Sequence, residues 1–222
     1  MPDIVVRPLT AATIAPAAQL LAGSMRDNPL HRRVFGGDEA RLEPLLARAF
    51  ARLLRRQMGN GLVLAAYDED ALVGVAAMVA PGHCQPRLQD KLGMLMVLAR
   101  AGALWRLPRI QRWLGRWKRH DPDIDHWHLG PAAVDRTRQG QGIGTGLMAE
   151  ICKELDRRQG IGYLETDKDA NVRLYRRGGF EIVAEQWILG VRNWFMLRHP
   201  LPRHEPLPGI DATSDTHAPK TQ

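Results

Sequence analysis

The sequence predicts a single α/β domain over residues 1–199, and three observations support this prediction. The 222-residue chain is 45% hydrophobic, which is enough to form one sizeable core. Apolar segments with strand-like and helix-like periodicity follow one another along the chain. A glycine-rich stretch at residues 138–146 lies between a strand-like and a helix-like segment. From residue 200 onward prolines and polar residues dominate, so we expect little order in residues 200–222.

The N-terminal part predicts a strand followed by two helices. Residues 3–8 read as the strand, and Thr10 offers a side-chain oxygen as the N-cap of the following helix. The Arg-Asp-Asn-Pro sequence at residues 26–29 breaks that helix. Apolar residues then recur at three- and four-residue spacing over residues 42–54, which predicts an amphipathic helix ending at Gly-Asn-Gly, residues 59–61.

The middle of the chain predicts a hairpin and a helical segment. Two apolar runs at residues 62–67 and 72–79 flank an Asp-Glu-Asp turn, as in a β-hairpin. Residues 84–120 read as helical and basic. After them we expect strands at residues 127–134, 163–167, 181–189 and 191–197, a helix from residue 143 to about residue 159, and a short helix from residue 171.

The glycine-rich stretch at residues 138–146 predicts a phosphate site. It opens a helix, whose first backbone N–H groups have no partner within the helix and lie at the positive end of its dipole. The four glycines leave these groups without side-chain cover. The dinucleotide fingerprint and the P-loop do not fit, since Thr145 and Leu147 stand where further glycines are needed and no lysine follows.

Within this stretch, Gln139, Gly142 and Gly144 match the Gln-x-x-Gly-x-Gly signature of the GNAT superfamily of N-acetyltransferases. Further along, residues 163–167 (Tyr-Leu-Glu-Thr-Asp) and 171–180 (Asn-Val-Arg-Leu-Tyr-Arg-Arg-Gly-Gly-Phe) resemble the second conserved block of that superfamily. The two blocks stand in the same order as in the family.

Residues 127–134 and 194–196 complete the pattern, which is most similar to the puromycin N-acetyltransferase branch. The resemblance is specific over residues 126–198 and only schematic before them. It implies a GNAT fold: a mixed, mostly antiparallel sheet of six or seven strands flanked by helices, here with residues 84–120 as a helical insertion between the third and fourth strands. In that fold the fourth and fifth strands splay apart, and the pantetheine arm of the cofactor enters the gap.

By this resemblance the chain uses acetyl-CoA as a cosubstrate and transfers the acetyl group directly to an amine. Ala133 and Val134 would pair with the pantetheine arm through their backbone groups. Asn171, at the start of the short helix, would also contact the cofactor, unless it is only an ordinary polar residue at a helix end. The residues expected to hold the pyrophosphate through backbone N–H groups are Gln139, Gly140, Gln141, Gly142, Ile143, Gly144 and Thr145.

Acetyl transfer needs a proton donor for the departing sulfur and a proton acceptor for the amine. The resemblance assigns the donor to Tyr175, which shares a helix face with Asn171; a core aromatic is the alternative. Three acceptor candidates stay open. His128 and His126 alternate on the fourth strand, and the usual pKa of histidine, about 6.5, suits the task. Glu165 on the fifth strand is the rival and could act through water.

We expect the acceptor to be the amine of a small molecule. The break at residues 26–29 and the insertion at 84–120 are candidates for its binding site, with Asp27 as a counter-charge to an ammonium group and Trp105 in an apolar lid. The insertion could equally pack its Leu and Trp residues on the core. For the whole chain, the alternatives are a catalytically silent acyl-CoA-binding regulatory module and an acetyltransferase acting on a protein amine.

Composition excludes several other classes. The two cysteines, Cys84 and Cys152, are too few for a disulfide framework, and no Cys/His group has zinc-ligand spacing, so we expect no metal. The formal net charge of +7 suits a polyanionic cofactor, and no aromatic RNA-binding motif accompanies the arginines, so we expect no nucleic-acid partner. The N-terminus lacks the features of a signal peptide and no apolar run is long enough to span a bilayer, so we expect a cytoplasmic protein without a membrane partner. The sequence does not determine the oligomeric state.

Overall fold

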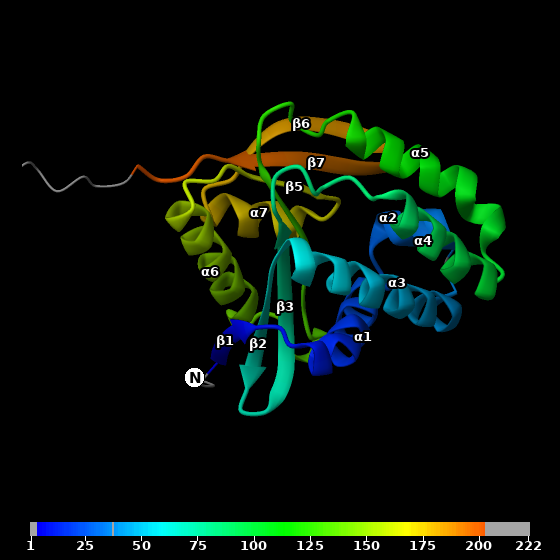
Figure 1. Ribbon diagram of the computed structural model, residues 1–222, viewed down its shortest axis with the longest axis horizontal. Coiled ribbons are helices and arrows are strands. Elements are labelled where there is room, and N and C mark those ends of the chain that lie inside the picture. The colour runs from blue at the N-terminus through cyan, green and yellow to red at the C-terminus, as the bar shows by residue number, and fades with distance from the viewer. Residues whose placement is uncertain (1–3, 37, 203–222) are drawn as a thin grey trace, which may run out of the picture.

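The computed structural model describes residues 4–36 and 38–202, which form a seven-stranded sheet with helices on both faces (Figure 1). The strand order is β1-β2-β3-β4-β5-β7-β6, and every neighbouring pair is antiparallel except β4 and β5. This confirms the predicted mixed, mostly antiparallel sheet. The strands are β1 (Ile4–Pro8), β2 (Gly61–Asp68), β3 (Ala71–Val79), β4 (Trp127–Val134), β5 (Gly162–Thr166), β6 (Glu181–Ile188) and β7 (Val191–Arg198).

Within the described ranges, seven α-helices connect or cover these strands. They are α1 (Ile14–Met25), α2 (Pro29–Phe35), α3 (Glu39–Asn60), α4 (Leu88–Arg100), α5 (Leu107–Lys118), α6 (Ile143–Arg157) and α7 (Asp169–Arg177). The short helix α2 was not predicted. Its start is nevertheless written in the sequence, because Asn28 accepts hydrogen bonds from the backbone N–H groups of Leu30 and His31 at 3.1 Å each, and Pro29 occupies the first helical position.

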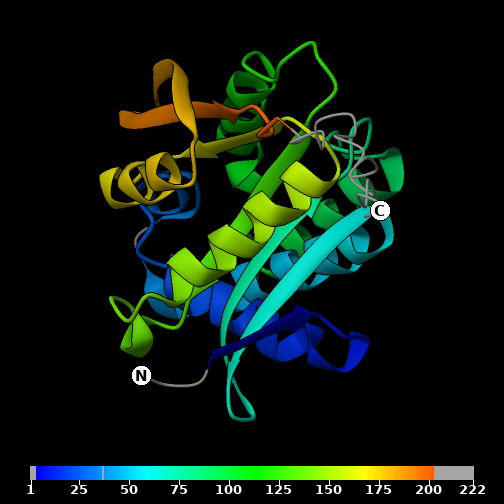
Figure 2. The ribbon, with the colours of Figure 1, turned by 90° about the vertical axis from the view of Figure 1, so that its left-hand side faces the viewer.

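Two hydrophobic layers sandwich the larger half of the sheet. On one face α6 buries Ile143, Leu147, Ile151 and Leu155, the four residues that its periodicity predicts. On the opposite face α1 and α3 pack their apolar stripes against β2 and β3. Figure 2 shows α6 lying along the sheet, with α1 and α3 behind it.

The fourth and fifth strands diverge after a short parallel contact. They pair only at Trp127 with Gly162 and at His128 with Tyr163, whereas β4 continues to Val134. Beyond this contact β5 pairs only with β7, so the edge of β4 that faces away from β3 lies open. This is the expected splay, and it places a gap between the two halves of the sheet.

The insertion at residues 84–120 forms α4, a 3₁₀ turn at Leu104–Arg106, and α5. Its apolar residues pack against α2 and the C-terminal strands in a third cluster that includes Val97, Leu98 and Ile110. Trp117 Nε1 also donates to Asn193 Oδ1 at 3.1 Å. The insertion therefore covers the core, which was the alternative to a lid over the acceptor site.

The predicted first residue of β1, Asp3, and the part of the tail from residue 203 to residue 222 lie outside the described residues. Residues 200–202 have no regular secondary structure. None of the helices in the described ranges has the length and hydropathy needed to cross a membrane.

Candidate active site

The glycine-rich loop leaves open space in front of the first turn of α6. Gly142 caps the helix in the left-handed conformation, with φ of +85°, and Gly140 has φ of +81°. A Cβ atom at either position would meet no atom within 4 Å. Ile143, Gly144 and Thr145 follow as the first three helical residues, whose N–H groups have no partner in the helix. An open helix N-terminus of this kind suits a pyrophosphate.

Two further residues of the signature fasten the loop to β4. A Cβ atom at Gly144 would lie 3.5 Å from Val134 Cγ2, so glycine permits close packing of α6 on the strand. The side chain of Gln139 donates from Nε2 to the carbonyl oxygen of Val134 at 3.2 Å. Ser24 Oγ donates to the same oxygen at 2.8 Å, which brings α1 to the end of the gap.

The backbone of β4 corrects one part of the prediction for the pantetheine arm. The N–H of Asp135 donates to Val73 on β3 at 2.9 Å. Because backbone groups alternate in direction along an antiparallel strand, those of Ala133 also face β3, whereas those of Ala132 and Val134 face the gap. Val134 is thus placed as expected, and Ala132 rather than Ala133 shares its open edge. The binding of the arm stays a prediction.

The helix α7 places Asn171 and Tyr175 one turn apart. It begins at Asp169, so Asn171 is its third residue, and Asn171 Nδ2 donates to Thr166 Oγ1 at 3.2 Å. Tyr175 is buried at 9% exposure. Burial, together with the carboxylate of Asp167, raises the pKa of Tyr175 to about 12. The hydroxyl therefore keeps its proton at neutral pH and is available as a donor.

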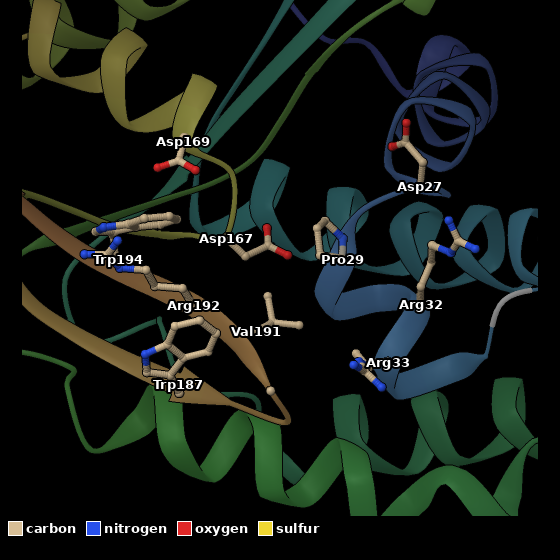
Figure 3. Close-up of a pocket in the computed structure, with 11 residues that line it drawn as sticks. Asp27, Pro29, Arg32, Arg33, Asp167, Asp169, Trp187, Val191, Arg192 and Trp194 are labelled. Carbon is tan, nitrogen blue, oxygen red and sulfur yellow. The ribbon is translucent and has the colours of Figure 1, made fainter.

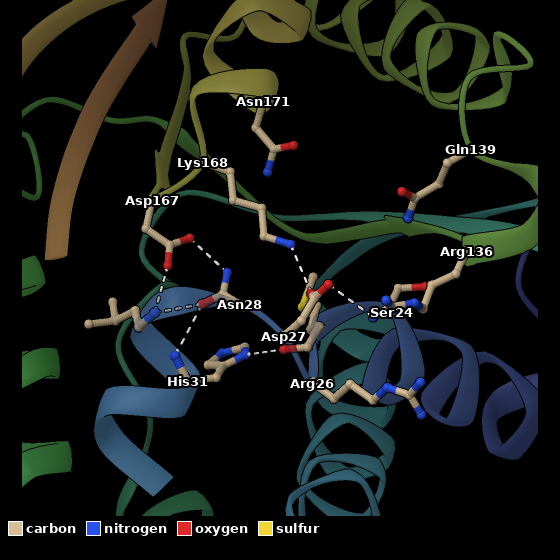
Figure 4. A network of polar contacts seen from close by, with 12 residues as sticks. Ser24, Arg26, Asp27, Asn28, His31, Arg136, Gln139, Asp167, Lys168 and Asn171 are labelled. Carbon is tan, nitrogen blue, oxygen red and sulfur yellow. Dashed lines mark hydrogen bonds and ion pairs between the residues drawn. The ribbon is translucent and has the colours of Figure 1, made fainter. Parts of the chain in front are cut away.

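The turn between α1 and α2 is tied to both sides of the gap (Figure 4). The carboxylate of Asp27 accepts from Arg136 Nη1 at 3.0 Å and from Lys168 Nζ at 3.1 Å. Partial burial disfavours ionisation of Asp27, but these two cations outweigh it and lower its pKa. Asp27 is therefore an ionised carboxylate with two resident partners. A substrate ammonium group would have to share it with them.

Asp167 adds a second tie beside the first. Its Oδ1 accepts from Asn28 Nδ2 at 2.7 Å, and its Oδ2 accepts from the backbone N–H of Leu30 at 2.9 Å (Figure 4). The residue that follows β5 thus also fixes the start of α2. Neither Asp167 nor Lys168 was predicted, because their partners lie more than a hundred residues away in sequence.

A cavity of about 730 Å³ opens beside these ties (Figure 3). It lies between α2, the connection from β5 to α7, and the hairpin of β6 and β7. Carboxylates, guanidinium groups and two tryptophan rings face it together. The lining residues are Asp27, Pro29, Arg32, Arg33, Asp167, Asp169, Trp187, Gly190, Val191, Arg192 and Trp194.

Asp27 lines this cavity, whereas Trp105 lies away from it. Pro29 from the predicted break lines it as well. Trp105 is 63% exposed, its ring lies 3.4 Å from the Arg106 guanidinium, and no lining residue comes from the insertion at residues 84–120. The insertion is absent from the wall because its apolar face packs on the core below α2. Trp187 and Trp194 supply the aromatic surface instead.

The three candidate proton acceptors form one connected group. His128 Nε2 donates to Glu165 Oε2 at 2.8 Å. Burial disfavours the imidazolium of His128, but the carboxylates of Glu165 and Asp121 outweigh it and raise its pKa well above the usual value. Asp121 and Cys84 likewise outweigh the partial burial of His126 and raise its pKa to about 10. Both rings therefore lie against carboxylates, and which of the three residues accepts the amine proton stays a prediction.

Cys84 and Asp121 were not expected beside these histidines. Cys84 Sγ lies 3.6 Å from His126 Nε2, and Asp121 Oδ1 lies 3.2 Å from the same nitrogen. Our expectation that the chain binds no metal rested on spacing along the sequence. Cys84 and His126 are 42 residues apart, so spacing could not reveal this group.

The sequence matches one known protein family, and the fold matches solved structures. The family model of the acetyltransferase (GNAT) family matches residues 29–180, which is more than half of the chain. The chain belongs to the GNAT family of acetyltransferases. Its resemblance to the puromycin N-acetyltransferase branch stays a prediction.

Solved structures share the fold of this GNAT acetyltransferase. A structure from Corynebacterium glutamicum, described as histone acetyltransferase HPA2 and related acetyltransferase, has a TM-score of 0.63 and 18% sequence identity to this chain. The alignment covers 91% of this chain and 99% of the other. A ribosomal-protein-alanine N-acetyltransferase from Brucella melitensis is 20% identical with a TM-score of 0.54, over 88% and 99%. The yncA protein of Salmonella typhimurium, solved with its cofactor acetyl-CoA, is 13% identical with a TM-score of 0.54, over 92% and 98%.

Proposed function

We propose that this protein transfers the acetyl group of acetyl-CoA to the amine of a small molecule. The observation that carries the proposal is the cavity of about 730 Å³, which is lined by Asp167, a residue whose charge also acts on Tyr175. Sites for small ligands commonly measure about 300–1,000 Å³, so this cavity is large enough for one.

The residues around the gap fit acetyl-CoA, which when bound supplies the acetyl group as an activated thioester. The open first turn of α6, with Gly140 and Gly142 uncovered, suits the pyrophosphate. The edge of β4 at Ala132 and Val134, which no strand pairs with, suits the pantetheine arm, although the carbonyl oxygen of Val134 already accepts from Ser24 and Gln139. A net charge of +7 favours a polyanion, and one solved structure with this fold was determined with acetyl-CoA.

Two residues would manage the protons. Tyr175 keeps its hydroxyl proton and would donate it to the sulfur as the thioester breaks. Glu165 would take the proton that the amine must lose, either directly or through a water molecule. The hydrogen bond from His128 Nε2 fixes the orientation of the Glu165 carboxylate, so in this proposal His128 positions the acceptor and does not replace it.

The cavity wall suggests the kind of amine. Trp187 and Trp194 provide flat apolar surface, and Asp167 and Asp169 attract a cationic amine before it loses its proton. Arg192 lies over the ring of Trp194 at 5.0 Å and already donates to Glu185, so an acidic group on the same molecule would share its guanidinium with that residue. We therefore propose an amine that carries an apolar portion, with or without a carboxylate.

A panel of amines tests the proposal, with release of free CoA thiol as the measurement. The panel includes aromatic amines, amino acids, polyamines and short peptides with free N-termini. Turnover of aromatic amines above the peptides is the expected result. Turnover of peptides alone would assign the acceptor to a protein amine. Thermal stabilisation by acetyl-CoA without thiol release from any amine would indicate a silent binding module.

A further inference from the structure

We propose that Cys84, Asp121, His126 and His128 form a binding site for a divalent transition-metal ion, with Zn²⁺ as the best match. Cys84 Sγ lies 3.6 Å from His126 Nε2. Asp121 Oδ1 lies 3.2 Å from that nitrogen and 3.6 Å from His128 Nδ1. The sulfur and the ligand atoms of the two histidines all lie within 4.8 Å of one another. Three possible ligand atoms therefore face one centre, and Asp121 Oδ1 lies beside the two histidines as a fourth.

Three of the separations agree with tetrahedral coordination. Zinc binds nitrogen and oxygen at about 2.0–2.2 Å and sulfur at about 2.3 Å, so neighbouring ligands in a tetrahedron lie about 3.3–3.7 Å apart. The observed separations of 3.2, 3.6 and 3.6 Å fall at or near this range. A mixed set of thiolate, imidazole and carboxylate ligands is also the set that zinc uses in proteins.

Each imidazole is oriented by its other nitrogen. His126 Nδ1 donates to the carbonyl oxygen of Ile124 at 2.8 Å, which leaves Nε2 for the centre. His128 Nε2 donates to Glu165 at 2.8 Å, which leaves Nδ1 for the centre. Histidines that bind metals usually donate their second N–H to a carbonyl or carboxylate in this way, because the bond fixes the tautomer and the ring orientation.

In the carboxylate of Asp121, too, one oxygen is held by a neighbouring residue and the other faces the centre. Gln85 Nε2 donates to its Oδ2 at 2.8 Å, whereas its Oδ1 is buried without a hydrogen-bond partner. His128 Nδ1 is the second buried atom of this group without one. Asp121 Oδ1 has only ion-pair contacts, with His126 Nε2 at 3.2 Å and with His128 Nδ1 at 3.6 Å, and such poorly bonded polar atoms are rare in a protein interior. A bound cation would satisfy both.

A thiol nucleophile activated by histidine is the competing explanation for Cys84. In such a triad the thiol and the orienting acid contact opposite nitrogens of one imidazole. Here both Cys84 Sγ and Asp121 Oδ1 face the same nitrogen of His126, and the opposite nitrogen faces a carbonyl group. Around His126 the arrangement is that of a common centre, which suits a metal, and this ring provides no relay from the thiol to Asp121. His128 also interacts with Cys84, and its Nε2 contacts Glu165, so a relay would have to run through this second ring, and the cobalt spectra described below separate the two explanations.

The site lies where the insertion meets the sheet. Cys84 precedes α4, Asp121 follows α5, and the two histidines stand at the start of β4. A metal would therefore join both ends of the insertion to the sheet. Glu165 lies on the far side of His128 from this centre, so the metal site adjoins the proposed proton acceptor without being part of the cavity.

Metal binding by the full chain tests the proposal. The purified protein is stripped with a chelator, then titrated with Zn²⁺ and separately with Co²⁺. We expect one equivalent of tightly bound Zn²⁺ by mass spectrometry and a rise in melting temperature that the chelator reverses. Co²⁺ should give the intense visible bands of tetrahedral geometry and a sulfur-to-cobalt charge-transfer band in the near ultraviolet.

Variants identify the ligands. Cys84→Ser should remove the charge-transfer band and weaken Zn²⁺ binding at least a hundredfold, and His126→Gln should weaken it to a similar extent. Gln85→Ala removes only the bond that orients Asp121, so it should weaken binding about tenfold with the fold intact. The matched control is Cys152→Ser, because Cys152 is the second free cysteine and lies between α6 and Gly178.

Two results would overturn the metal site. One is a wild-type protein that binds less than half an equivalent of Zn²⁺ and shows no charge-transfer band with Co²⁺, which decides the question even if Cys84→Ser fails to fold. The other is a folded Cys84→Ser protein that binds Zn²⁺ as tightly as the wild type, since the metal would then lie elsewhere.

Discussion

The carboxylate of Asp27 accepts a hydrogen bond from Lys168 at 3.1 Å, and this contact joins the α1–α2 turn to the connection between β5 and α7. Arg136 holds the same carboxylate from the other side of the gap at 3.0 Å. One residue of the N-terminal half thus bridges the two strands between which the cofactor is expected to enter. It also lines the cavity proposed for the acceptor.

Asp27→Asn keeps the shape of this side chain and removes its charge. The side chain is 38% exposed, so the loss in free energy of unfolding should stay near or below about 1 kcal/mol. We expect the KM for the amine to rise about threefold to tenfold, with the KM for acetyl-CoA changed by less than about twofold. Steady-state kinetics with each substrate varied in turn measures both. Asp38→Asn, which weakens the cap of α3, is the control. Equal changes in both KM values would mean that Asp27 only supports the fold.

Gly142→Glu tests the pyrophosphate site. The substitution places a carboxylate in front of the helix N-terminus, so the rise in melting temperature that acetyl-CoA causes should disappear. The left-handed backbone at Gly142 adds a cost of about 1–2 kcal/mol in stability. Gly102→Glu is matched for this cost, since Gly102 has φ of +62° and equally open surroundings after α4. If acetyl-CoA stabilises Gly142→Glu as much as Gly102→Glu, the pyrophosphate binds elsewhere.

Tyr175→Phe removes one hydroxyl group and almost no volume. We expect kcat to fall by roughly 10²-fold to 10⁴-fold, the usual contribution of a general acid, while acetyl-CoA affinity stays the same. Because the pKa of Tyr175 is raised to about 12, this donor should remain protonated up to about pH 11, and the wild-type rate should not fall below that pH through loss of this proton. Tyr67→Phe on β2 serves as the control. Full turnover by Tyr175→Phe would return Tyr175 to a packing role.

Substitutions of two exposed tryptophans test whether the acceptor binds in the cavity or on the insertion. Trp187 is 70% exposed and lines the cavity, whereas Trp105 is 63% exposed and does not. Trp187→Ala should raise the KM for an aromatic amine by about tenfold, the scale of one lost aromatic contact, and Trp105→Ala should leave it unchanged. Because the two side chains are similarly exposed, Trp187→Ala and Trp105→Ala should change the free energy of unfolding by similar amounts. An effect of Trp105→Ala alone would move the acceptor site to the insertion.

Asp156 provides a test of stability against pH. Its two carboxylate oxygens accept from Arg198 Nη1 and Nη2 at 2.8 Å each, and these bonds lower the pKa of Asp156 despite partial burial. A lowered pKa stabilises the fold above the ordinary value near 4, and this contribution is lost as the pH falls through the lowered value. Asp156→Asn should therefore cost about 2 kcal/mol in unfolding free energy at pH 7, a cost that shrinks between pH 4 and pH 2.

Urea unfolding of both proteins at pH 7, 4 and 3 measures this difference. Glu154→Gln is the control, because Glu154 on the same helix pairs with Arg157 in a more exposed position and should cost less than about 0.5 kcal/mol. A deficit in Asp156→Asn that stays constant with pH would show that the ion pair is not its cause.

Local signals in the sequence predicted most of the fold. The bounds of β4 were predicted without error, and Gly142 marked the start of α6, because alternation and glycine placement act within a few residues. The buried face of α6 followed from its own periodicity. Helix α2 was missed because seven residues are too few for a periodic pattern, although Asn28 and Pro29 carried a capping signal.

The acceptor site could not be predicted to the same extent. Amphipathic spacing in the insertion correctly indicated a buried face, but spacing does not say which surface covers that face. Trp105 was therefore assigned to the pocket, whereas Trp187 and Trp194 reach it because β6 pairs with β7. The contacts of His128 could not be predicted either, because spacing along the chain does not show which side chains lie next to it. Glu165 and Asp121 determine its protonation, and both are placed by tertiary contacts.

The hydrogen bond between Gln85 and Asp121 at 2.8 Å closes the insertion at its base. A segment whose two ends meet before it joins the sheet contributes a nearly fixed closure entropy, which grows only slowly with its length. Residues between these ends that do not pack on the core can therefore be added, removed or exchanged without moving β3 or β4. Relatives with a different cover over this part of the core could share the same sheet, gap and glycine loop, and the helices α4 and α5 would be the replaceable module of this enzyme.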